Sequence, residues 1–384
     1  MIYVLNVKFV ILVLKINYHR EFWEKSMQMR TEALREELNK SGLSGYIITH
    51  INNIYYFTCF LDIPDAKLCL IVPLKGEPIL FTNPLSYSAA FEKARGCVVK
   101  LVKSSEKILE EVMDEVRALK LTQVGFDDMG ISFYLKLVKK LRNVDFQQRT
   151  ELVWKLRKVK SDEEIRWMKK AAEFADAGMK AGLEAVKAGV HEYEVAAEAE
   201  YEMRARGSEG TAFETIVASG PRSAYPHGVC SDRIIQKGDF VILDIGGVYK
   251  GYKSDLTRTV VAGEPSSKQG KLFNLVLEAQ NEAFRQIKAG IKANDLDGLA
   301  RKIIEGKGYR DKFLHGLGHG VGLNIHEPPT LSKSSKDILE EGNVVTVEPG
   351  VYIQGFGGMR IEDTVLVLRG TGEKLTKTPC TLMI

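Results

Sequence analysis

Two segments of this sequence combine apolar, strand-forming residues with opposed carboxylates, and this combination limits what the chain can fold into. The first, residues 240–259, carries Asp244 and Asp255. A two-residue turn at Tyr249-Lys250 would place the two aspartates opposite each other on one face of a hairpin. Like charges in this position destabilise a sheet, and they do so more strongly when buried.

The second segment, residues 347–363, repeats the arrangement with glutamates. A loop centred on Gly355 would pair Glu348 with Glu362. In a single hairpin, one acid of such a pair would more simply be a solvated turn residue. Two pairs inside apolar strands instead require a compensating cation.

Three histidines lie close before the second segment. The chain has seven, and His315, His319 and His326 fall within twelve residues. Four glycines in this stretch disfavour a helix, and the chain has no HExxH motif, so the zincin arrangement is excluded. Glycines on both sides of His319 predict a close approach of backbone or substrate.

Four carboxylates and one imidazole suit a pair of divalent ions such as Mn, Co or Zn. Such ions, about 3.5–4 Å apart, generate a nucleophile from water and polarise a carbonyl. The chemistry expected from these residues is hydrolysis of an acyl bond.

The first block of the chain, residues 29–150, alternates helical and strand patterns, which predicts an α/β domain with a mostly covered sheet. Helices are expected over residues 29–40, 87–93, 105–119 and 131–141, and strands over residues 46–48, 68–72, 79–81, 97–102 and 124–126.

The second block, residues 151–384, has the pattern of an α+β domain. Ser161 followed by Glu164 is a capping box that opens a long helix, and another helix starts near His191. Two further helices (268–289, 296–307) separate glycine-rich strands at 215–219, 240–246, 255–261, 344–352 and 361–368. Two helices followed by strands, occurring twice, indicate a duplicated half-domain.

Residues 1–28 are interpreted as an extension outside the core, with a more natural start at Met27 or Met29. The apolar run 1–16 is shorter than the roughly 20 residues that span a bilayer, and three polar residues interrupt it. It also lacks the flanks of a signal peptide. A packed extra strand and a membrane anchor are the alternatives.

Composition excludes several classes of function. The chain is 45% hydrophobic, and 54 basic against 50 acidic residues leave a net charge of +4, so we expect no nucleic-acid or membrane partner. Five scattered cysteines without a CxxC pair argue against a cysteine-rich zinc site and indicate a reducing cytoplasm.

Several segments together resemble the pita-bread metallopeptidases, peptidase family M24. The likeness covers roughly residue 29 to the C-terminus, and its proline-peptidase branch, the Xaa-Pro aminopeptidases and Xaa-Pro dipeptidases (prolidases), is most similar. The motifs that carry it are residues 213–220, Pro226-His227-Gly228, the two aspartates, residues 315–326, Glu348-Pro349-Gly350 and residues 360–364. The resemblance implies a creatinase-like N-terminal domain (29–150) and a pita-bread catalytic domain (151–384).

The resemblance also implies a set of metal ligands. Asp255 and Glu362 would bridge two divalent ions, Mn or Co first and Zn as an alternative. Asp244 would bind one ion, and His319 and Glu348 the other.

Roles around the metals follow from the same resemblance. His227 and His326 would position the substrate and stabilise the tetrahedral oxyanion. Glu348 would shuttle a proton from water to the leaving amine. His315 would support the site from behind, and Arg360 would orient the carboxylates.

The implied activity is release of the N-terminal residue from Xaa-Pro dipeptides or from peptides that start with Xaa-Pro, by a cytoplasmic homodimer. A methionine aminopeptidase would share the ligands but not the first block, and a creatinase would lack the ligands. A non-catalytic peptide-binding member typically loses ligands as well. Both dipeptidase and aminopeptidase activity remain possible. The choice depends on whether the site is closed beyond the carboxylate side of the proline.

Overall fold

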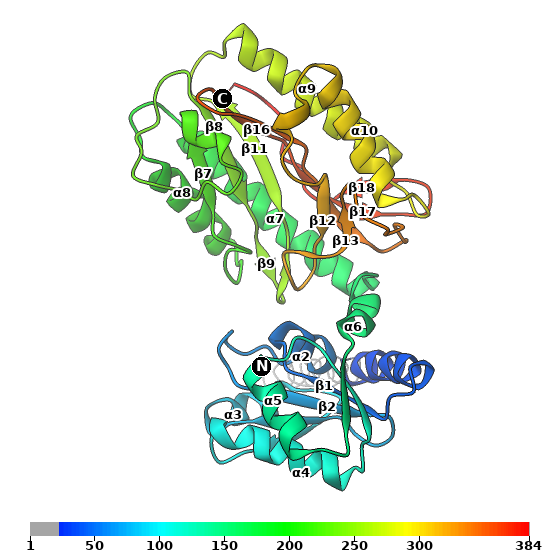
Figure 1. Cartoon of the computed structure of the whole chain (residues 1–384). Helices are drawn as coiled ribbons and strands as arrows, with labels where there is room; N and C mark the ends of the chain where they lie inside the picture. The colour runs from blue at the N-terminus through cyan, green and yellow to red at the C-terminus, as the bar shows by residue number, and fades with distance from the viewer. Residues whose placement is uncertain (1–22, 384) are drawn as a thin grey trace, which may run out of the picture. The chain divides into compact units, whose positions relative to one another are not determined.

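Figure 1 shows the computed structural model of the chain, in which residues 23–383 are described. The chain divides into two compact units, Met1–Leu156 and Arg157–Ile384. The predictions for the apolar run 1–16 lie outside the described residues. Across residues 23–383, no helix is both long and apolar enough to cross a membrane.

The first unit is built on a six-stranded mixed sheet with the order β4-β3-β2-β1-β5-β6. Strand β2 pairs antiparallel with both β1 and β3. The other three pairs, β1–β5, β5–β6 and β3–β4, are parallel. The strands are β1 (Gly45–Ile48), β2 (Cys69–Pro73), β3 (Ile79–Thr82), β4 (Val98–Leu101), β5 (Gln123–Phe126) and β6 (Asp145–Gln148).

Helices connect these strands, which confirms the predicted α/β alternation. They are a helix over residues 23–40, α2 (Ile51–Thr58), α3 (Pro84–Lys93), α4 (Ile108–Ala118) and α5 (Ile131–Lys140). The prediction missed α2 and β6. It also started the first helix too late: Met27, Leu34 and Leu38 are all fully buried at helical spacing, so the apolar face begins before residue 29.

The second unit contains two helix pairs and four small sheets. Its helices are α7 (Asp162–Ala185), α8 (Glu192–Ala205), α9 (Ser267–Gln286) and α10 (Ala293–Gly306), preceded by α6 (Thr150–Arg157). A three-stranded sheet has the order β11-β8-β7, and a five-stranded sheet has the order β13-β12-β14-β17-β18. Two hairpins, β9/β10 and β15/β16, complete it.

The strands of this unit are short and largely buried. They are β7 (Ile216–Ser219), β8 (Phe240–Ile245), β9 (Val248–Tyr249), β10 (Tyr252–Lys253), β11 (Leu256–Val261), β12 (Gly318–Gly320), β13 (Glu327–Leu331), β14 (Val344–Val347), β15 (Gly350–Ile353), β16 (Gly357–Arg360), β17 (Asp363–Val367) and β18 (Gly372–Lys374).

The two halves of the second unit repeat the same order of elements, as the sequence predicted. Both long helices start with a capping box, Ser161 with Glu164 and Ser266 with Gln269. Helices α7 and α8 pack on β7, β8 and β11, whereas α9 and α10 contribute to a separate core with β14 and β17. In Figure 1, α8 lies on one side of the strands and α9 and α10 lie on the other.

Candidate metal centre

The first carboxylate pair corrects the predicted register. Asp244 pairs with Thr257, not with Asp255. The turn lies one residue further on, at Lys250-Gly251, and both turn residues have positive φ, 52° and 72°, as a type I′ hairpin turn requires. A one-residue shift of the turn moves every partner by two positions. Asp255 therefore stays on the same face as Asp244, but as a diagonal neighbour.

The second pair has the predicted register. The β14–β17 ladder and the β15–β16 ladder share one alignment, which places Glu348 opposite Glu362 between them. Gly355 lies at the centre of the hairpin loop with a φ of 76°. The Glu362 N–H donates to the carbonyl oxygen of Thr257 at 3.1 Å, which joins this hairpin to the first one.

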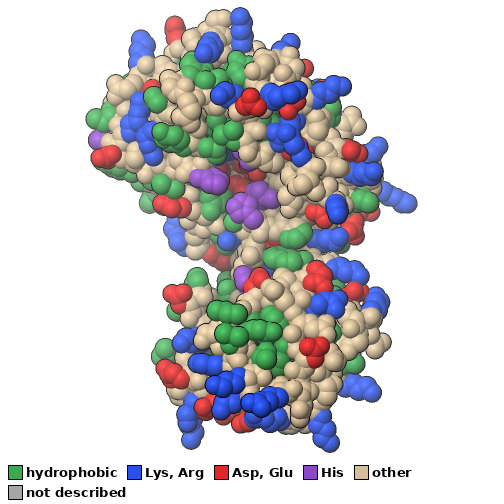
Figure 2. Space-filling model, viewed as in Figure 1, with side chains coloured by type: hydrophobic (Ala, Val, Ile, Leu, Met, Phe, Trp, Pro, Cys, Tyr) green, Lys and Arg blue, Asp and Glu red, His purple; other side chains and the backbone are tan. Residues whose placement is uncertain are grey.

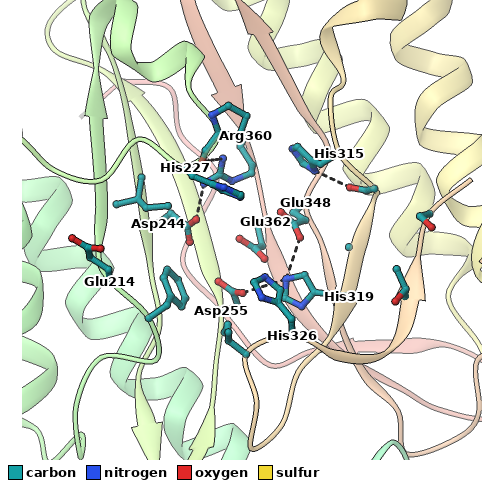
Figure 3. A pocket seen from close by; sticks show the side chains of 18 of the residues that line it. Glu214, His227, Asp244, Asp255, His315, His319, His326, Glu348, Arg360 and Glu362 are labelled. Carbon is teal, nitrogen blue, oxygen red and sulfur yellow. Dashed lines mark hydrogen bonds and ion pairs between the residues drawn. The ribbon is translucent and has the colours of Figure 1, made fainter. Parts of the chain in front are cut away.

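All nine residues singled out from the sequence line one cavity of about 500 Å³ in the second unit. Figure 2 shows histidine side chains around a hollow there, with acidic side chains inside it, and Figure 3 shows how they converge. They are His227, Asp244, Asp255, His315, His319, His326, Glu348, Arg360 and Glu362.

Asp255, His319 and Glu362 offer ligand atoms that all lie within 4.8 Å of one another. His319 Nε2 is also 3.3 Å from Glu348 Oε1. His319 sits on β12, where the two flanking glycines face backbone: a Cβ on Gly318 would lie 2.1 Å from the Thr346 carbonyl oxygen, for example. Gly318 and Gly320 were predicted to allow a close approach of backbone or substrate. In the structure, it is the backbone of neighbouring strands that approaches them.

Two carboxylate oxygens in the cluster test whether it fits metal ions. Asp244 Oδ1 and Glu362 Oε1 are buried and have no hydrogen-bond partner among residues 23–383. A buried carboxylate oxygen left without a partner is costly, and a divalent cation would remove that cost. Oxygen ligands with one imidazole are also the donors that such ions accept. The residues present fit the predicted metal centre.

Burial and mutual repulsion shift the protonation of these acids. Burial first, and neighbouring carboxylates second, raise the pKa values of Asp255 and Glu362 well above the usual range. Burial also raises the pKa of Asp244, against the pull of Arg360. Glu348 behaves differently: burial opposes its ionisation, but the hydrogen bond with His319 prevails and lowers its pKa to about 2. The centre therefore has more carboxyl groups than its own cations can keep ionised.

Arg360 supports the carboxylates through a chain of buried hydrogen bonds. Its Nη2 donates to Asp244 Oδ2 at 2.6 Å, and its Nε donates to Thr257 Oγ1 at 3.1 Å. Thr257 in turn donates to Glu362 Oε2 at 2.6 Å. One guanidinium thus orients members of both carboxylate pairs.

Sequence reasoning missed Thr257 and Tyr352 in this network. The hydroxyl of Tyr352 lies 2.9 Å from Arg360 Nη1 and 2.8 Å from His315 Nε2, which connects two predicted residues. A signal was present, because Tyr352 follows Glu348 by four residues and therefore shares its face of the strand. Thr257 could only have been found with the correct hairpin register.

His326 lies beside His319, with ring centroids 4.3 Å apart. Burial first, and then the positive charges of His319, His227 and Lys253, lower the pKa of His326. A neutral imidazole at pH 7 can donate one hydrogen bond into the cavity. His227 lines the same cavity from the loop that follows β7.

A second buried ion cluster lies next to His326 in the chain. Glu327 accepts from Arg157 Nη2 at 2.6 Å and from Lys160 Nζ at 2.9 Å, and all three side chains are at most 2% exposed. The Asn324 N–H also donates to this carboxylate. Arg157 ends α6, and Lys160 lies just before α7. The structure shows that they tether the loop carrying His326.

Comparison with known proteins agrees with this architecture. Residues 166–369 match the metallopeptidase family M24, and residues 30–159 match the creatinase/prolidase N-terminal domain. The Xaa-Pro dipeptidase of Pyrococcus furiosus is 40% identical over 92% of this chain and 99% of its own length.

Solved structures give the same result. The prolidase from Pyrococcus horikoshii OT3 superposes with a TM-score of 0.87 at 37% identity, covering 92% of this chain and 99% of that one. The X-Pro aminopeptidase from Thermotoga maritima MSB8 has a TM-score of 0.84 at 33% identity, with the same coverage. The predicted combination of a creatinase-like domain and a pita-bread domain is confirmed. The chain belongs to metallopeptidase family M24.

Proposed function

We propose that this metallopeptidase hydrolyses the bond between an N-terminal residue and proline, releasing the first residue. One observation carries the proposal. Two carboxylate pairs and His319 converge in one cavity, where two buried carboxylate oxygens have no partner. The relatives named as Xaa-Pro dipeptidase and X-Pro aminopeptidase supply the substrate class.

Two divalent ions would be held by five side chains, with Mn or Co as first choice and Zn as the alternative. Bound there, they would supply an activated water and polarise the scissile carbonyl. Asp255 and Glu362 would lie between the ions, because their carboxylates sit at the centre of the cluster (Figure 3). The ligands are Asp244, Asp255, His319, Glu348 and Glu362.

The other side chains would act on the substrate itself. Glu348, which stays ionised at neutral pH, would accept the proton of the attacking water and pass it to the proline nitrogen. His326 and His227 would donate hydrogen bonds to the developing oxyanion. Arg360 and His315 would keep the carboxylates and Tyr352 in place.

Proline specificity has a structural requirement. An Xaa-Pro bond is a tertiary amide without an N–H, so the site must recognise the ring instead. Phe213, Ile216, Val229 and Ile325 provide apolar lining for the cavity. We expect the trans isomer to be preferred.

The test is a comparison of Ala-Pro, Ala-Pro-Ala, Ala-Ala and Met-Ala with Mn or Co added. Rates on the proline peptides should exceed those on Ala-Ala and Met-Ala by at least about 100-fold, near the scale of strong pocket discrimination. Equal rates on Ala-Pro and Ala-Ala would refute proline specificity. Preference for Met-Ala would favour a methionine aminopeptidase. Failure to bind metal, together with no hydrolysis of any of the four peptides, would favour a peptide-binding protein.

We also propose that the functional protein is a cytoplasmic homodimer in which residues 29–150 and 151–384 form the two domains. The part of the proposed extension that precedes Met27 is proposed to be unnecessary for activity. A chain that starts at Met27 keeps the buried Met27 side chain, and we expect its rate and melting temperature to match those of the full chain. Light scattering measures the mass, and a single-chain mass would remove the dimer.

A further inference from the structure

The carboxylate end of a dipeptide substrate poses an electrostatic problem for this cavity. In Ala-Pro, the residue after the scissile bond ends in a free carboxylate, which surrounding acids repel. Arg360 is the sole lysine or arginine among the described residues that line the cavity. Its guanidinium already donates to Asp244, Thr257 and Tyr352. A cation for the substrate must come from elsewhere.

The direction of the first hairpin places Lys253 on the same face as Asp255, which lines the cavity. Tyr252 packs its ring 5.2 Å from that of Trp167, and Ser254 Oγ donates to the Ala171 carbonyl oxygen at 3.0 Å. Both contacts are with α7. Because side chains alternate along a strand, Lys253 points to the opposite face, the face from which Asp255 enters the cavity.

Lys253 is also tied to the loop that carries His326. Its backbone N–H donates to the Gly322 carbonyl oxygen at 2.9 Å. Its charge contributes to the lowered pKa of His326, after burial and the charges of His319 and His227. The lysine therefore lies within electrostatic range of a residue proposed to hold the substrate.

The ammonium group of Lys253 is available for a ligand. The side chain is partly buried, and no described residue gives its Nζ a hydrogen bond or an ion pair within 4 Å. Glu327 is the acid whose charge acts on Lys253, and it is already bound by Arg157 and Lys160. A partly desolvated cation without a partner gains free energy when an anion approaches it.

We propose that Lys253 determines substrate length by receiving the C-terminal carboxylate of an Xaa-Pro dipeptide. This inference rests on the proposed function and deepens it, because it selects the dipeptidase over the aminopeptidase. Lys253 acts through charge, so it discriminates between a free carboxylate and a blocked one.

The experiment compares Ala-Pro with Ala-Pro-amide, which differ only in that charge. Lys253→Met should lower kcat/KM for Ala-Pro about 10-fold or more, mainly through KM, as expected for lost ground-state binding. It should leave Ala-Pro-amide unchanged. Lys253→Arg should retain most of the activity on Ala-Pro. Lys250→Met, at the exposed turn of the same hairpin, is the matched control and should change neither substrate.

Two results would overturn the inference. If Lys253→Met lowers kcat/KM equally for Ala-Pro and its amide, the lysine has a structural role. If the variant leaves the kinetics on Ala-Pro unchanged, the lysine has no role in substrate binding. Failure of the proposed function is distinguishable, because the wild type would then cleave Ala-Pro no faster than Ala-Ala. In that case, calorimetry of Ala-Pro and Ala-Pro-amide binding to wild type and Lys253→Met still decides the role of the lysine.

Discussion

Two buried ion clusters lie side by side in the second unit, and they differ in charge balance. The metal centre collects four carboxylates around His319 and Arg360, and two of its oxygens have no hydrogen-bond partner. The Glu327 cluster has one carboxylate and two cations, each paired within 2.9 Å. The first is incomplete without an added cation, whereas the second is satisfied by the protein itself. Charge imbalance, rather than burial of charge, marks the functional cluster.

The largest expected effect comes from removing a proposed bridging ligand. Glu362→Gln should reduce bound metal below two ions per chain and lower kcat by more than about 10³-fold, since the metals supply the nucleophile. Without metal, the same variant should melt at a higher temperature than the wild type, because it removes one of four mutually repelling carboxylates. Elemental analysis that finds two ions in an active variant would contradict the ligand assignment.

The balanced cluster should respond in the opposite direction. Glu327→Gln removes the negative charge shared by two buried cations, and we expect a loss of about 3–5 kcal/mol in the free energy of unfolding. Denaturant unfolding of the metal-free protein measures it. Lys158→Met is the control, because the Lys158–Glu340 pair is open to solvent, with side chains 27% and 50% exposed, and should contribute less than about 1 kcal/mol. Similar losses in the two variants would remove the distinction between the clusters.

His326 lies between the two clusters and should affect catalysis without affecting metal binding. His326→Ala should lower kcat by roughly 10²–10³, the scale for losing an oxyanion donor. Metal content should stay at two ions per chain. An unchanged kcat would refute its proposed role, and a loss of metal would make it a ligand.

The smallest effect is expected in the pH dependence of the metal-free protein. Asp255 and Glu362 have raised pKa values in the folded state, so folding takes up protons there. Their contribution to stability is fully present below the unfolded pKa and is lost as the pH rises through the folded pKa. The melting temperature of chelated protein should therefore rise from neutral to mildly acidic pH. A flat or falling profile would argue against close carboxylate pairing.

The sequence predicted those helices and strands whose own residues show a capping motif or an apolar periodicity. The capping box at Ser161 and the apolar periodicity of the long helices are local, so they survive in any tertiary context. Strand β6, Asp145–Gln148, was missed because only Phe146 of its four residues is buried, so it has no apolar alternation. It forms through parallel pairing with β5, which no local pattern reveals.

The candidate site divides in the same way. The sequence by itself determined which residue types carry the chemistry, because acids inside apolar strands and histidines among glycines are unfavourable without a ligand. Only the tertiary structure decided which atoms meet. Lys250 and Gly251, not Tyr249 and Lys250, take the two left-handed turn positions, and this single choice pairs Asp244 with Thr257. Arg157 and Lys160 reach Glu327 across more than 160 positions of sequence, and such a contact depends on packing, since no local pattern specifies it.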